Sequence, residues 1–565
     1  MGPASLWLAG SILKGHAVNT EVIIVGAGPV GLTLAINLGR QNIRCILFER
    51  HPKPQFLPKM ERCNARSMEM FRRIGLSDKI RAAGLRSDCP MDVFIVEDLT
   101  KPPLLTEKHP SIDEFTKRIR AIEDLSSPLE PYQLISQYTL EPLLKEVAES
   151  LPSVDVRFGH TFDEFEQDDE GVTVHCTGPD GSRVTERAAY LVGCDGGTSP
   201  IRKQLGIRLR GEGGILMLQQ ALFYCEELYD KLPRGDGPGR GRHYHRADTE
   251  HTFLLMQDST KHWSLHATVP DAESMKRKFE EVVGFPVKYE MLSCAPWKQN
   301  LLLADRYREK RVFLAGDSVH LVIPTGGLGM NTGVGDAFDL AWKLAATLKG
   351  WGGPELLDSY EIERRQVGDR NVGASRFANV GRHKWRALSA ANIFEDTPEG
   401  HAVKATLIAS ADSEQRKGNR MIGAELGYRY VDSPCIDNIP GGPEHRIGEY
   451  NPTTWPGARL PHCWLDDGTP MQDHLPETYV LLRLGRKAAS GSAVAQAYAA
   501  IKAPFQEVSI PSDRIRDLYQ SDLILMRPDL HIVWRGNAVP DNLTEIVSLS
   551  TGHGRGLERP ELPAQ

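Results

Sequence analysis

The sequence contains no apolar run long enough to cross a membrane. A spanning helix needs about 18 consecutive apolar residues, and no stretch of the 565 residues approaches that length. The apolar piece SLWLAGSIL near the start precedes Lys14, whereas a secretory signal carries its positive charge before the apolar part. We therefore expect residues 1–19 to be an extension of unknown purpose, and we expect no stable membrane insertion.

Cysteine pairs with C-x-x-C spacing are also absent, and charge of one sign is in only mild excess. The net charge of −7, with 25% charged and 41% hydrophobic residues, is typical of a globular protein and gives no reason to expect a nucleic-acid partner. An odd number of scattered cysteines favours free thiols in a reducing compartment, so we expect a cytoplasmic protein. The nine are Cys45, Cys63, Cys89, Cys176, Cys194, Cys225, Cys294, Cys435 and Cys463.

Metal-ligand spacing is missing as well. The histidines gathered between residues 243 and 266 show no convincing pair on a helix, so we expect strand or loop residues and no metal site.

What the sequence does contain is a complete dinucleotide-binding βαβ unit. The buried-strand pattern EVIIV (21–25) runs into the glycine triplet GAGPVG (26–31) and then into residues at helical spacing. A second strand, RCILF (44–48), ends at Glu49. Strand, triplet, helix, strand and acid stand in the order that a nucleotide cofactor requires.

Each part of this unit has a physical role. Gly26 makes the tight turn, Gly28 lets a pyrophosphate approach, and Gly31 lets the helix pack on the strand. Glu49 is placed to accept hydrogen bonds from an adenosine ribose. The predicted cofactor residues here are Gly26, Gly28, Pro29, Val30, Gly31, Glu49 and Arg50.

A second glycine loop lies within the stretch 311–345. An apolar strand pattern (312–315) ends at Gly316-Asp317, and the glycine-rich segment 324–329 follows. From about Met330 the apolar residues recur at helical spacing. A loop that feeds a helix start directs free N–H groups and the positive end of the helix dipole outward. This arrangement favours an anionic or electron-rich ligand.

Three further segments are candidates for cofactor contact. The basic stretch 59–66 is either a solvated loop or a source of phosphate or flavin contacts from Lys59, Arg62 or Arg66. Gln137 begins a predicted helix, where its amide either meets a cofactor or caps the helix. A strand ending in Asp195, followed by glycines and a helix start carrying Arg202, repeats the acid–glycine–helix pattern.

The remaining segments predict further elements. Residues 154–190 read as an antiparallel meander, 215–300 as a second sheet suited to substrate, and 92–130 as polar surface loops. Residues 354–425 read as helical, followed by a Pro- and Gly-rich wrap. After it we expect strands at 479–484 and 505–510, a helix near 493–501, and a hairpin.

Over about residues 20–385 the chain resembles the class A FAD-dependent aromatic hydroxylases, which have the p-hydroxybenzoate hydroxylase fold. The resemblance rests on GAGPVG with Glu49, on CDG (194–196) through Arg202, and on GDS (316–318) with GGLGMNTGVGDAFDLAWKL. The C-terminal third resembles the thioredoxin-like domain appended to phenol, 3-(3-hydroxyphenyl)propionate and polyketide hydroxylases. Without C-x-x-C a dithiol reaction is excluded, which leaves packing or homodimer formation as its role.

This resemblance implies an α/β fold: a Rossmann-like FAD-binding domain, an inserted antiparallel-sheet domain and a thioredoxin-like α/β domain. The expected organisation is an extension (1–19), a discontinuous FAD-binding domain (20–200 and 301–385), a substrate sheet (201–300), a helical connection (386–430), the thioredoxin-like domain (431–550) and a tail (551–565).

The resemblance also implies roles for individual residues. Asp317 would bind the ribityl or pyrophosphate region, and Asp195 and Arg202 would contact FAD and NAD(P)H. Ser318 and Leu328 depart from the usual residues, and Leu328 leaves the polarity beside the flavin open. The loop expected to line the isoalloxazine contains Pro324, Gly327, Leu328, Gly329, Met330 and Asn331, and Gln137 with Lys59 or Arg62 match positions that touch FAD.

The implied reaction is hydroxylation of a phenol-like aromatic by O2 through a flavin C4a-hydroperoxide, with NADPH or NADH as reductant. The absence of a second glycine fingerprint agrees with a nicotinamide that binds transiently. Alternatives are epoxidation, Baeyer–Villiger insertion or inactivating oxidation of a polyketide or drug-like compound, and a flavin-carrying scaffold. The catalytic residues stay unknown, because no general base is assignable among the candidates Glu61, Tyr224, Tyr244 and His245.

Overall fold

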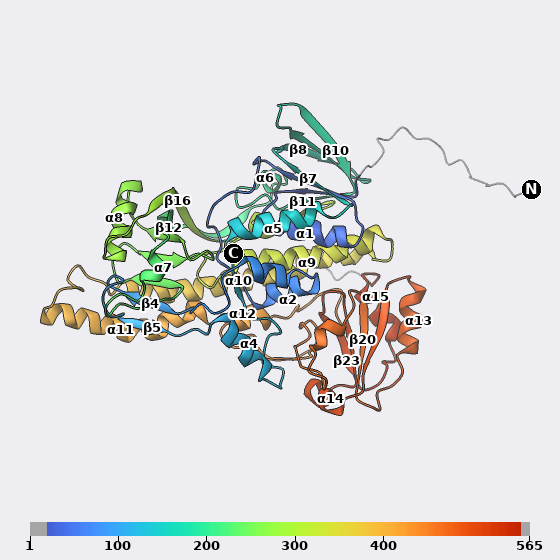
Figure 1. The fold of residues 1–565 in the computed structure, drawn as a ribbon. Helices are drawn as coiled ribbons and strands as arrows, with labels where there is room; N and C mark the ends of the chain where they lie inside the picture. Colours follow the sequence, from blue (N-terminus) through green and yellow to red (C-terminus); the bar gives the residue numbers. More distant parts are fainter. Residues whose placement is uncertain (1–19, 555–565) are drawn as a thin grey trace, which may run out of the picture.

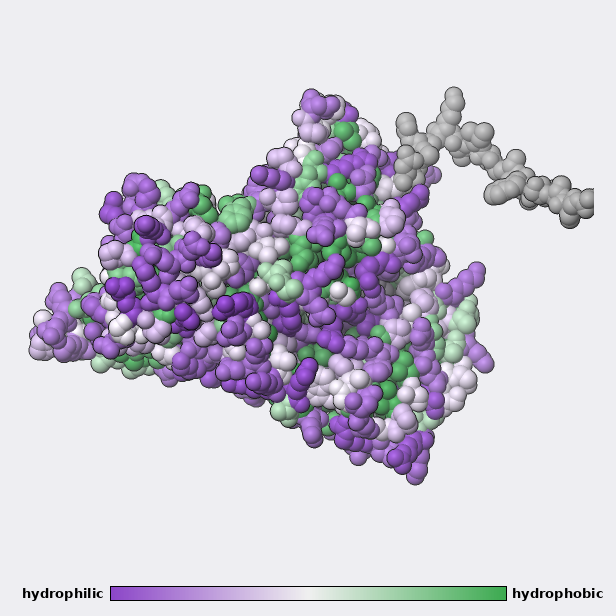
Figure 2. Space-filling view, viewed as in Figure 1, coloured by the Kyte–Doolittle hydropathy of each residue, from purple (hydrophilic) through white to green (hydrophobic). Residues whose placement is uncertain are grey.

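The computed structural model describes residues 20–554, so the predicted extension 1–19 and residues 555–565 of the predicted tail lie outside the described residues. Figure 1 shows a central part that contains the predicted nucleotide-binding segments, a lobe built on a large sheet, and a C-terminal lobe coloured orange to red. The face in Figure 2 is mostly hydrophilic, with hydrophobic residues in small separate groups. Within the described range no helix is both long and apolar enough to span a membrane, and all nine cysteines are free.

The central sheet has six strands, all parallel except the edge strand β17. Helices cover one face and the three-stranded meander covers the other (Figure 1), which is why β1 reads as a continuous apolar run. The strands in spatial order are β17 (Arg308–Glu309), β18 (Val312–Leu314), β11 (Tyr190–Gly193), β1 (Val22–Val25), β2 (Cys45–Glu49) and β7 (Val154–Phe158). The helices of this part are α1 (Pro29–Arg40), α2 (Ala65–Arg73), α3 (Ser77–Ala83), α5 (Gln137–Glu149), α6 (Pro200–Gln204) and α9 (Gly329–Leu348), with a 3-10 turn at Gly316–Ser318.

The predicted meander is correct for three strands and wrong for the first. β7 pairs with β2 in the parallel sheet, so only β8 (Thr161–Gln167), β9 (Val172–Thr177) and β10 (Arg183–Ala188) form the antiparallel unit. Cys45 pairs with Val154 in this register, a contact between residues far apart in the chain.

The second sheet is mixed and has eight strands. They are β19 (His320–Leu321), β16 (Glu290–Ala304), β12 (Leu209–Tyr224), β15 (His262–Ala267), β14 (Phe253–Met256), β13 (His243–Arg246), β4 (Val93–Val96) and β5 (Leu105–Glu107). The segment 92–130, predicted as loops, therefore contains two strands and the helix α4 (Ile112–Arg120). Its overall polar composition hides the short buried run VFIV that forms β4.

The two faces of this sheet differ because side chains alternate along each strand. Tyr244, Trp263 and Leu265 point into a hydrophobic core with the helix α8 (Ala272–Val283), near the short α7 (Leu228–Lys231). His243 and His266 therefore point to the opposite face. The helices α10 (Pro354–Arg386) and α11 (Pro398–Asn419) pack on that face, and Figure 1 shows α8 and α11 on opposite sides of this lobe. The short helix α12 (Ile422–Leu426) follows them in the chain. A two-stranded ribbon, β3 (Arg62–Cys63) with β6 (Gln133–Leu134), connects the sheet to the nucleotide part.

The C-terminal lobe has the thioredoxin-like strand order, with β20 parallel to β21 and antiparallel to β22, which pairs with β23. The predicted strands 479–484 and 505–510 are confirmed to the residue. The elements are a 3-10 turn (Met471–His474), β20 (Tyr479–Leu484), α13 (Ser492–Ala500), β21 (Phe505–Ile510), α14 (Asp513–Tyr519), β22 (Leu523–Met526), β23 (Ile532–Gly536) and α15 (Leu543–Ser550). Thr551 is buried and its carbonyl accepts from Gly353 N–H at 2.7 Å, so the chain stays attached at the start of the predicted tail.

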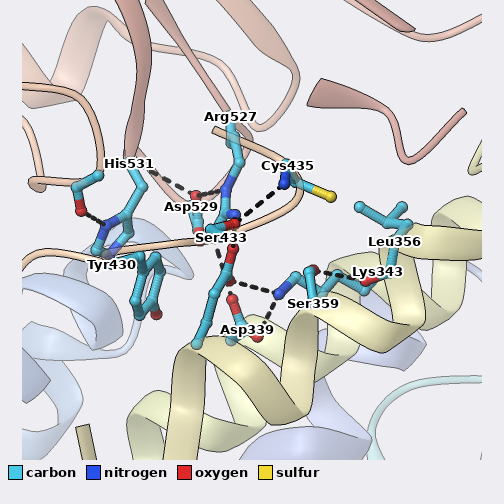
Figure 3. A network of polar contacts seen from close by, with 12 residues as sticks. Asp339, Lys343, Leu356, Ser359, Tyr430, Ser433, Cys435, Arg527, Asp529 and His531 are labelled. Atoms are coloured by element: carbon cyan, nitrogen blue, oxygen red, sulfur yellow. Dashed lines mark hydrogen bonds and ion pairs between the residues drawn. The ribbon is translucent and has the colours of Figure 1, made fainter. Parts of the chain in front are cut away.

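A buried ion network joins this lobe to α9 and α10 (Figure 3). Arg527, before the β22–β23 turn, contacts Glu363 of α10 at 2.5 Å and Asp529 at 2.6 Å. Lys343 of α9 contacts Glu363 at 2.6 Å and Asp339 at 2.7 Å. Three carboxylates thus share two cations away from water.

Candidate cofactor and substrate site

The first glycine turn is built as the sequence predicts. Gly26 has φ +105°, and a β-carbon there would lie 2.3 Å from the carbonyl oxygen of Cys194. A β-carbon at Gly31 would lie 1.9 Å from the carbonyl oxygen of Gly26. At Gly28 the nearest atom would be 3.9 Å away, on Glu141. Two glycines therefore allow close packing, while Gly28 leaves space beside the uncapped N-terminus of α1.

Glu49 is held firmly beside this turn. Its two carboxylate oxygens accept from the N–H groups of Ala27 and His51, each at 2.9 Å. Arg50 is exposed and donates to the His51 ring at 3.3 Å. Pro29 occupies the first turn of α1, where its missing N–H costs nothing. The carboxylate at the end of β2 thus has a fixed position next to the open side of the turn.

Val30 connects the first glycine turn to the GDS motif (316–318) and to α9. A β-carbon at Gly316, which has φ +67°, would lie 2.9 Å from Val30, and one at Gly333 would lie 2.5 Å from it. The Gly316 N–H donates to Asp336 at 3.0 Å. Asp336 was not among the sequence-based candidates, because a buried acid inside a helix pattern carries no local signal of its partners.

Asp336 holds the GDS motif (316–318) in place through the Gly316 N–H. It pairs with Arg364 at 2.7 Å and with the Nε2 of His320 at 2.8 Å, and all three side chains are buried. Burial would raise the pKa of Asp336, but Arg364 and His320 outweigh it and hold that pKa below its ordinary value. The neighbouring Asp317 is exposed, yet enclosing protein raises its pKa against the opposing charges of His320 and Lys59.

The segment 194–202, which contains Asp195 and Arg202, bonds to its own loop and to the loop at Ser318. Asp195 Oδ2 accepts from the Ser199 hydroxyl at 2.8 Å and the Ile201 N–H at 3.2 Å, while its buried Oδ1 has no partner among the described residues. Arg202 donates to the carbonyls of Ser318 at 2.8 Å and Gly197 at 2.9 Å. Burial raises the pKa of Asp195 and lowers that of Arg202. Arg202 thus links the segment 194–202 to the GDS motif (316–318).

Gln137 and Lys59 lie beside Glu141 on the open side of the first turn. The amide of Gln137 donates to Glu141 at 2.6 Å rather than capping α5. Burial raises the pKa of Glu141, and the nearby Gln137 and Lys59 oppose this shift. Both predicted residues therefore face the region that Gly28 leaves open.

The loop 324–331 is held by the strand that precedes α2. Arg62 donates to the Gly326 carbonyl at 2.9 Å. Asn331 accepts from the Asn64 N–H at 2.9 Å and donates to the Gly327 carbonyl at 2.7 Å. No side chain caps α9, so its first N–H groups stay available to a ligand at this loop.

The remaining predicted loop residues have different environments. Leu328 is buried with Ala374, Ala378 and Met421, so its hydrophobic side chain fills a helix interface. Pro324 is exposed, and Gly329 and Met330 are half-buried. Ser318, another departure from the resembled family, donates to the carbonyls of Gly193 at 2.9 Å and Ala315 at 2.8 Å.

Of the four candidates for the general base, Tyr244 and His245 have hydrogen-bond partners within the protein. The Tyr244 hydroxyl is buried between Gly239 and Gly241. His245 contacts Arg386 at 3.4 Å. Tyr224 lies at the end of β12.

The fourth candidate, Glu61, contacts the Nε2 of His243 at 2.7 Å. His243 was not among the sequence-based candidates for the base, because 182 residues separate the two side chains. Glu61 also adjoins Arg62, which holds the glycine loop. Through Glu61 and Arg62, which are adjacent in the chain, the Glu61–His243 pair of the large sheet is therefore linked to the glycine loop 324–331.

Protonation of the pair follows from its surroundings. Burial would raise the pKa of Glu61, but His243, Arg242 and Arg62 outweigh it and hold the carboxyl well below its ordinary pKa. Burial lowers the pKa of His243 to about 4, against the pull of Glu61 and with the help of Arg242. We take the ring as neutral, donating Nε2–H to an ionised Glu61. Nδ1 is then an acceptor.

Comparisons with known proteins identify the family. Residues 19–375 match the model described as FAD binding domain, and residues 453–553 match Aromatic-ring hydroxylase, C-terminal. The FAD-dependent monooxygenase apdD of Emericella nidulans is 32% identical over 551 residues, covering 92% of this chain and 88% of that protein. A putative polyketide hydroxylase of Streptomyces halstedii is 32% identical over 575 residues, covering 93% and 95%. The solved structure of RebC with bound 7-carboxy-K252c has a TM-score of 0.86 at 31% identity, covering 95% of this chain and 99% of that one.

These matches confirm the predicted fold class, the FAD cofactor and the enzyme class. NAD(P)H is the co-substrate typical of the family. The chain therefore belongs to the FAD-dependent aromatic-ring hydroxylases, which are flavoprotein monooxygenases.

Proposed function

We propose that this monooxygenase hydroxylates a phenol-type ring, including rings of the polyketide kind, on the polar face of the eight-stranded sheet. One atom of O2 replaces a ring hydrogen as hydroxyl and the other leaves as water, while NADPH or NADH supplies two electrons. The segment 61–64 carries the proposal, because Arg62 and Asn64 hold the glycine loop and Glu61 holds His243. The resemblance to a named polyketide hydroxylase supports the ring class.

The chain offers FAD a consistent set of partners. When bound, FAD takes up the electrons of the nicotinamide and activates O2. Gly28 and the start of α1 would receive the pyrophosphate, and Glu49 the ribose. Lys59, Gln137 and Asp317 would face the linking region. The uncapped start of α9 would stabilise negative charge on the reduced ring.

Arg202 would act on FAD indirectly. Arg202 connects the segment 194–202 to the GDS motif (316–318) through the carbonyls of Gly197 and Ser318. Within residues 20–554, the unpartnered Oδ1 of Asp195 is a group of the segment 194–202 left for a ligand. Free thiols at all nine cysteines support our proposal of a cytoplasmic location.

His243 is the proposed acceptor of the phenol proton. Its neutral ring presents Nδ1 as acceptor, and Glu61 partly offsets the burial that disfavours the imidazolium. An ionised phenol is more electron-rich and so reacts faster with an electrophilic oxygen. The pair thus prepares the ring for hydroxylation.

His243→Gln should lower kcat/KM for the phenol by about 100- to 10,000-fold, the usual contribution of a general base. FAD content should stay at the wild-type level, because the His243 ring bonds to Glu61 and not to the proposed cofactor residues. The matched control is His401→Gln on α11, whose side chain is 61% exposed. A His243→Gln enzyme as active as the control would contradict the assignment.

The pH profile gives an independent prediction. Because the neutral ring is the base and its pKa is lowered to about 4, protonation should remove activity only near that pH. The acidic limb of kcat/KM should therefore lie well below about 6.5, the ordinary histidine value. The limb should be lost in His243→Gln. An acidic limb at the ordinary histidine pKa would argue against a buried neutral base.

The proposed function is tested by the visible spectrum of the purified protein, then by NADPH and NADH oxidation with a panel of phenols. We expect bound flavin whose reduction is accelerated by at least one phenol. Bound flavin that responds to no phenol would overturn the ring class. A new epoxide or ester in the products would indicate the alternative chemistries instead.

A further inference from the structure

The C-terminal lobe holds one tyrosine of the segment that precedes it, Tyr430. The rings of Tyr430 and His531 are stacked, with centroids 4.2 Å apart, and His531 directly precedes β23 of the lobe (Figure 3). The Tyr430 N–H donates to the Gly457 carbonyl at 3.0 Å, and the Nδ1–H of His531 donates to the same carbonyl at 2.9 Å. The guanidinium carbon of Arg527 lies 5.2 Å from the centroid of the Tyr430 ring. Stacking, hydrogen bonding and a cation–π contact thus fix this side chain to the lobe.

The hydroxyl of Tyr430 contacts a residue outside the lobe, Arg364 of α10. Arg364 Nη1 donates to this hydroxyl at 3.2 Å, and the two side chains are only 1–2% exposed. Burial raises the pKa of Tyr430 against the pull of Arg364, so the hydroxyl stays neutral. A buried guanidinium needs protein acceptors, because its N–H groups cannot bond to water. Tyr430 therefore supplies one acceptor to Arg364 from the side of the lobe.

Arg364 in turn holds two segments of the proposed flavin site. Its Nε donates to Asp336 at 2.7 Å, and Asp336 accepts from the Gly316 N–H of the GDS motif at 3.0 Å. Its Nη2 donates to the Thr332 carbonyl, in the first turn of α9, at 2.9 Å. A β-carbon at Gly335 would lie 2.7 Å from the same Nη2, so this glycine leaves the space that the guanidinium occupies.

A continuous chain of contacts therefore runs from the lobe to the GDS motif. Its members, in order, are His531, Tyr430, Arg364, Asp336 and the Gly316 N–H. The four side chains are buried, so water does not replace a lost contact. A buried polar network is rigid when every member has its partner, and each nitrogen of Arg364 has one. Removing one acceptor should loosen both segments that Arg364 holds.

We propose that the C-terminal lobe completes the flavin site, with Tyr430 as a positioning residue that acts through Arg364 and Asp336 on the GDS motif and the first turn of α9. This inference rests on the proposed placement of FAD at that turn, and it gives the lobe a role beyond packing. The start of α9 would stabilise the negative charge of the reduced ring. Its position then determines how readily the bound flavin is reduced.

The test is Tyr430→Phe, which keeps the stacked ring and removes only the hydroxyl acceptor. In the FAD-loaded protein without any phenol, we expect the FAD dissociation constant to rise about 10-fold, the lower range for a hydrogen bond to a charged group. The flavin reduction potential should fall, because reduced flavin should lose more affinity than oxidised flavin. Amide hydrogen exchange over residues 316–335 should become faster, while exchange in β20 stays at the wild-type rate.

Tyr498→Phe is the matched control for this substitution. Tyr498 is also fully buried, and its hydroxyl bonds to the Ser550 Oγ at 2.8 Å inside the lobe. Its loss should lower the stability of the lobe to a similar extent and leave FAD affinity and reduction potential unchanged. The comparison separates positioning of the flavin site from a general loss of stability.

Arg364→Lys separates the two steps of the inference. Lysine keeps the positive charge but has one nitrogen in place of three, so the flavin properties should change at least as much as in Tyr430→Phe. Unchanged FAD affinity and reduction potential in Tyr430→Phe would overturn the role of the lobe. Unchanged values in Arg364→Lys as well would overturn the placement of FAD at α9. These readouts need no phenol, so failure of every phenol to stimulate NAD(P)H oxidation would overturn the proposed function alone.

Discussion

Replacing Gly31 with alanine should yield a colourless protein that takes up no FAD. The new β-carbon would lie 1.9 Å from the Gly26 carbonyl oxygen and 3.3 Å from the Cys194 side chain. The first atom is backbone, so it gives way only if the turn between β1 and α1 opens. Opening the turn would move Gly28 and the start of α1, which are the proposed pyrophosphate site. We expect the flavin absorbance per protein to fall to background, with added FAD failing to restore it.

Gly373→Ala is the matched control for this substitution. Gly373 lies inside α10, and apart from its chain neighbours and the adjoining helix backbone no heavy atom lies within 4 Å of the place that its β-carbon would take. Alanine there should keep FAD bound and stabilise the helix by about 0.5–1 kcal/mol. Gly31→Ala protein with a full complement of flavin would contradict the role given to the first turn.

Arg527→Met should release the C-terminal lobe from α9 and α10. Removing the guanidinium leaves Glu363, Asp339 and Asp529 with Lys343 as the remaining cation of the network (Figure 3). Breaking a buried ion pair by removing one partner costs about 3–5 kcal/mol. In the variant we expect the C-terminal lobe to unfold at a lower denaturant concentration than in the wild type. In limited proteolysis we expect this lobe to be cleaved before the rest of the chain.

The pH dependence of this loss has a definite sign. Burial would raise the pKa of Glu363, but Arg527 and Lys343 outweigh it and lower that pKa to about 2. Without Arg527 the carboxyl should take up a proton as the pH falls, which relieves the uncompensated charge. The difference in stability between variant and wild type should therefore shrink at acidic pH and grow as the pH rises.

Arg514→Met provides the surface comparison within the same lobe. Arg514 is 43% exposed and pairs with Asp466 at 2.9 Å, and exposed pairs contribute about 0–1 kcal/mol. Its loss should leave unfolding and proteolysis close to wild type. If Arg527→Met behaved like Arg514→Met, the buried network would not be what holds the lobe in place.

Features set by short-range patterns could be predicted from the sequence. The turn Gly26–Gly31 and the strands β20 and β21 follow from glycine positions and apolar runs over a few residues, and the structure places them as expected. In each case one local segment determines the backbone, so its sequence contains the needed information.

Features set by distant pairing could not be predicted. β4 becomes a strand because it pairs in parallel with β13. The sequence of the polar segment 92–130 contains no information about this pairing. Glu61 and His243 meet across 182 residues, and Glu363 and Arg527 across 164. Leu328 raised a question of polarity beside the flavin, but its side chain is buried against α10. Which partner an acid or a base finds depends on the tertiary fold.

The most direct test of the central claim is turnover under ¹⁸O2 with NADPH or NADH and each of the panel of phenols, followed by mass spectrometry of the product. We predict that the product carries one labelled oxygen atom as a new ring hydroxyl, while the second labelled atom appears in water. NAD(P)H oxidation that delivers both oxygen atoms to hydrogen peroxide, with an unlabelled aromatic for every phenol tried, would contradict this claim.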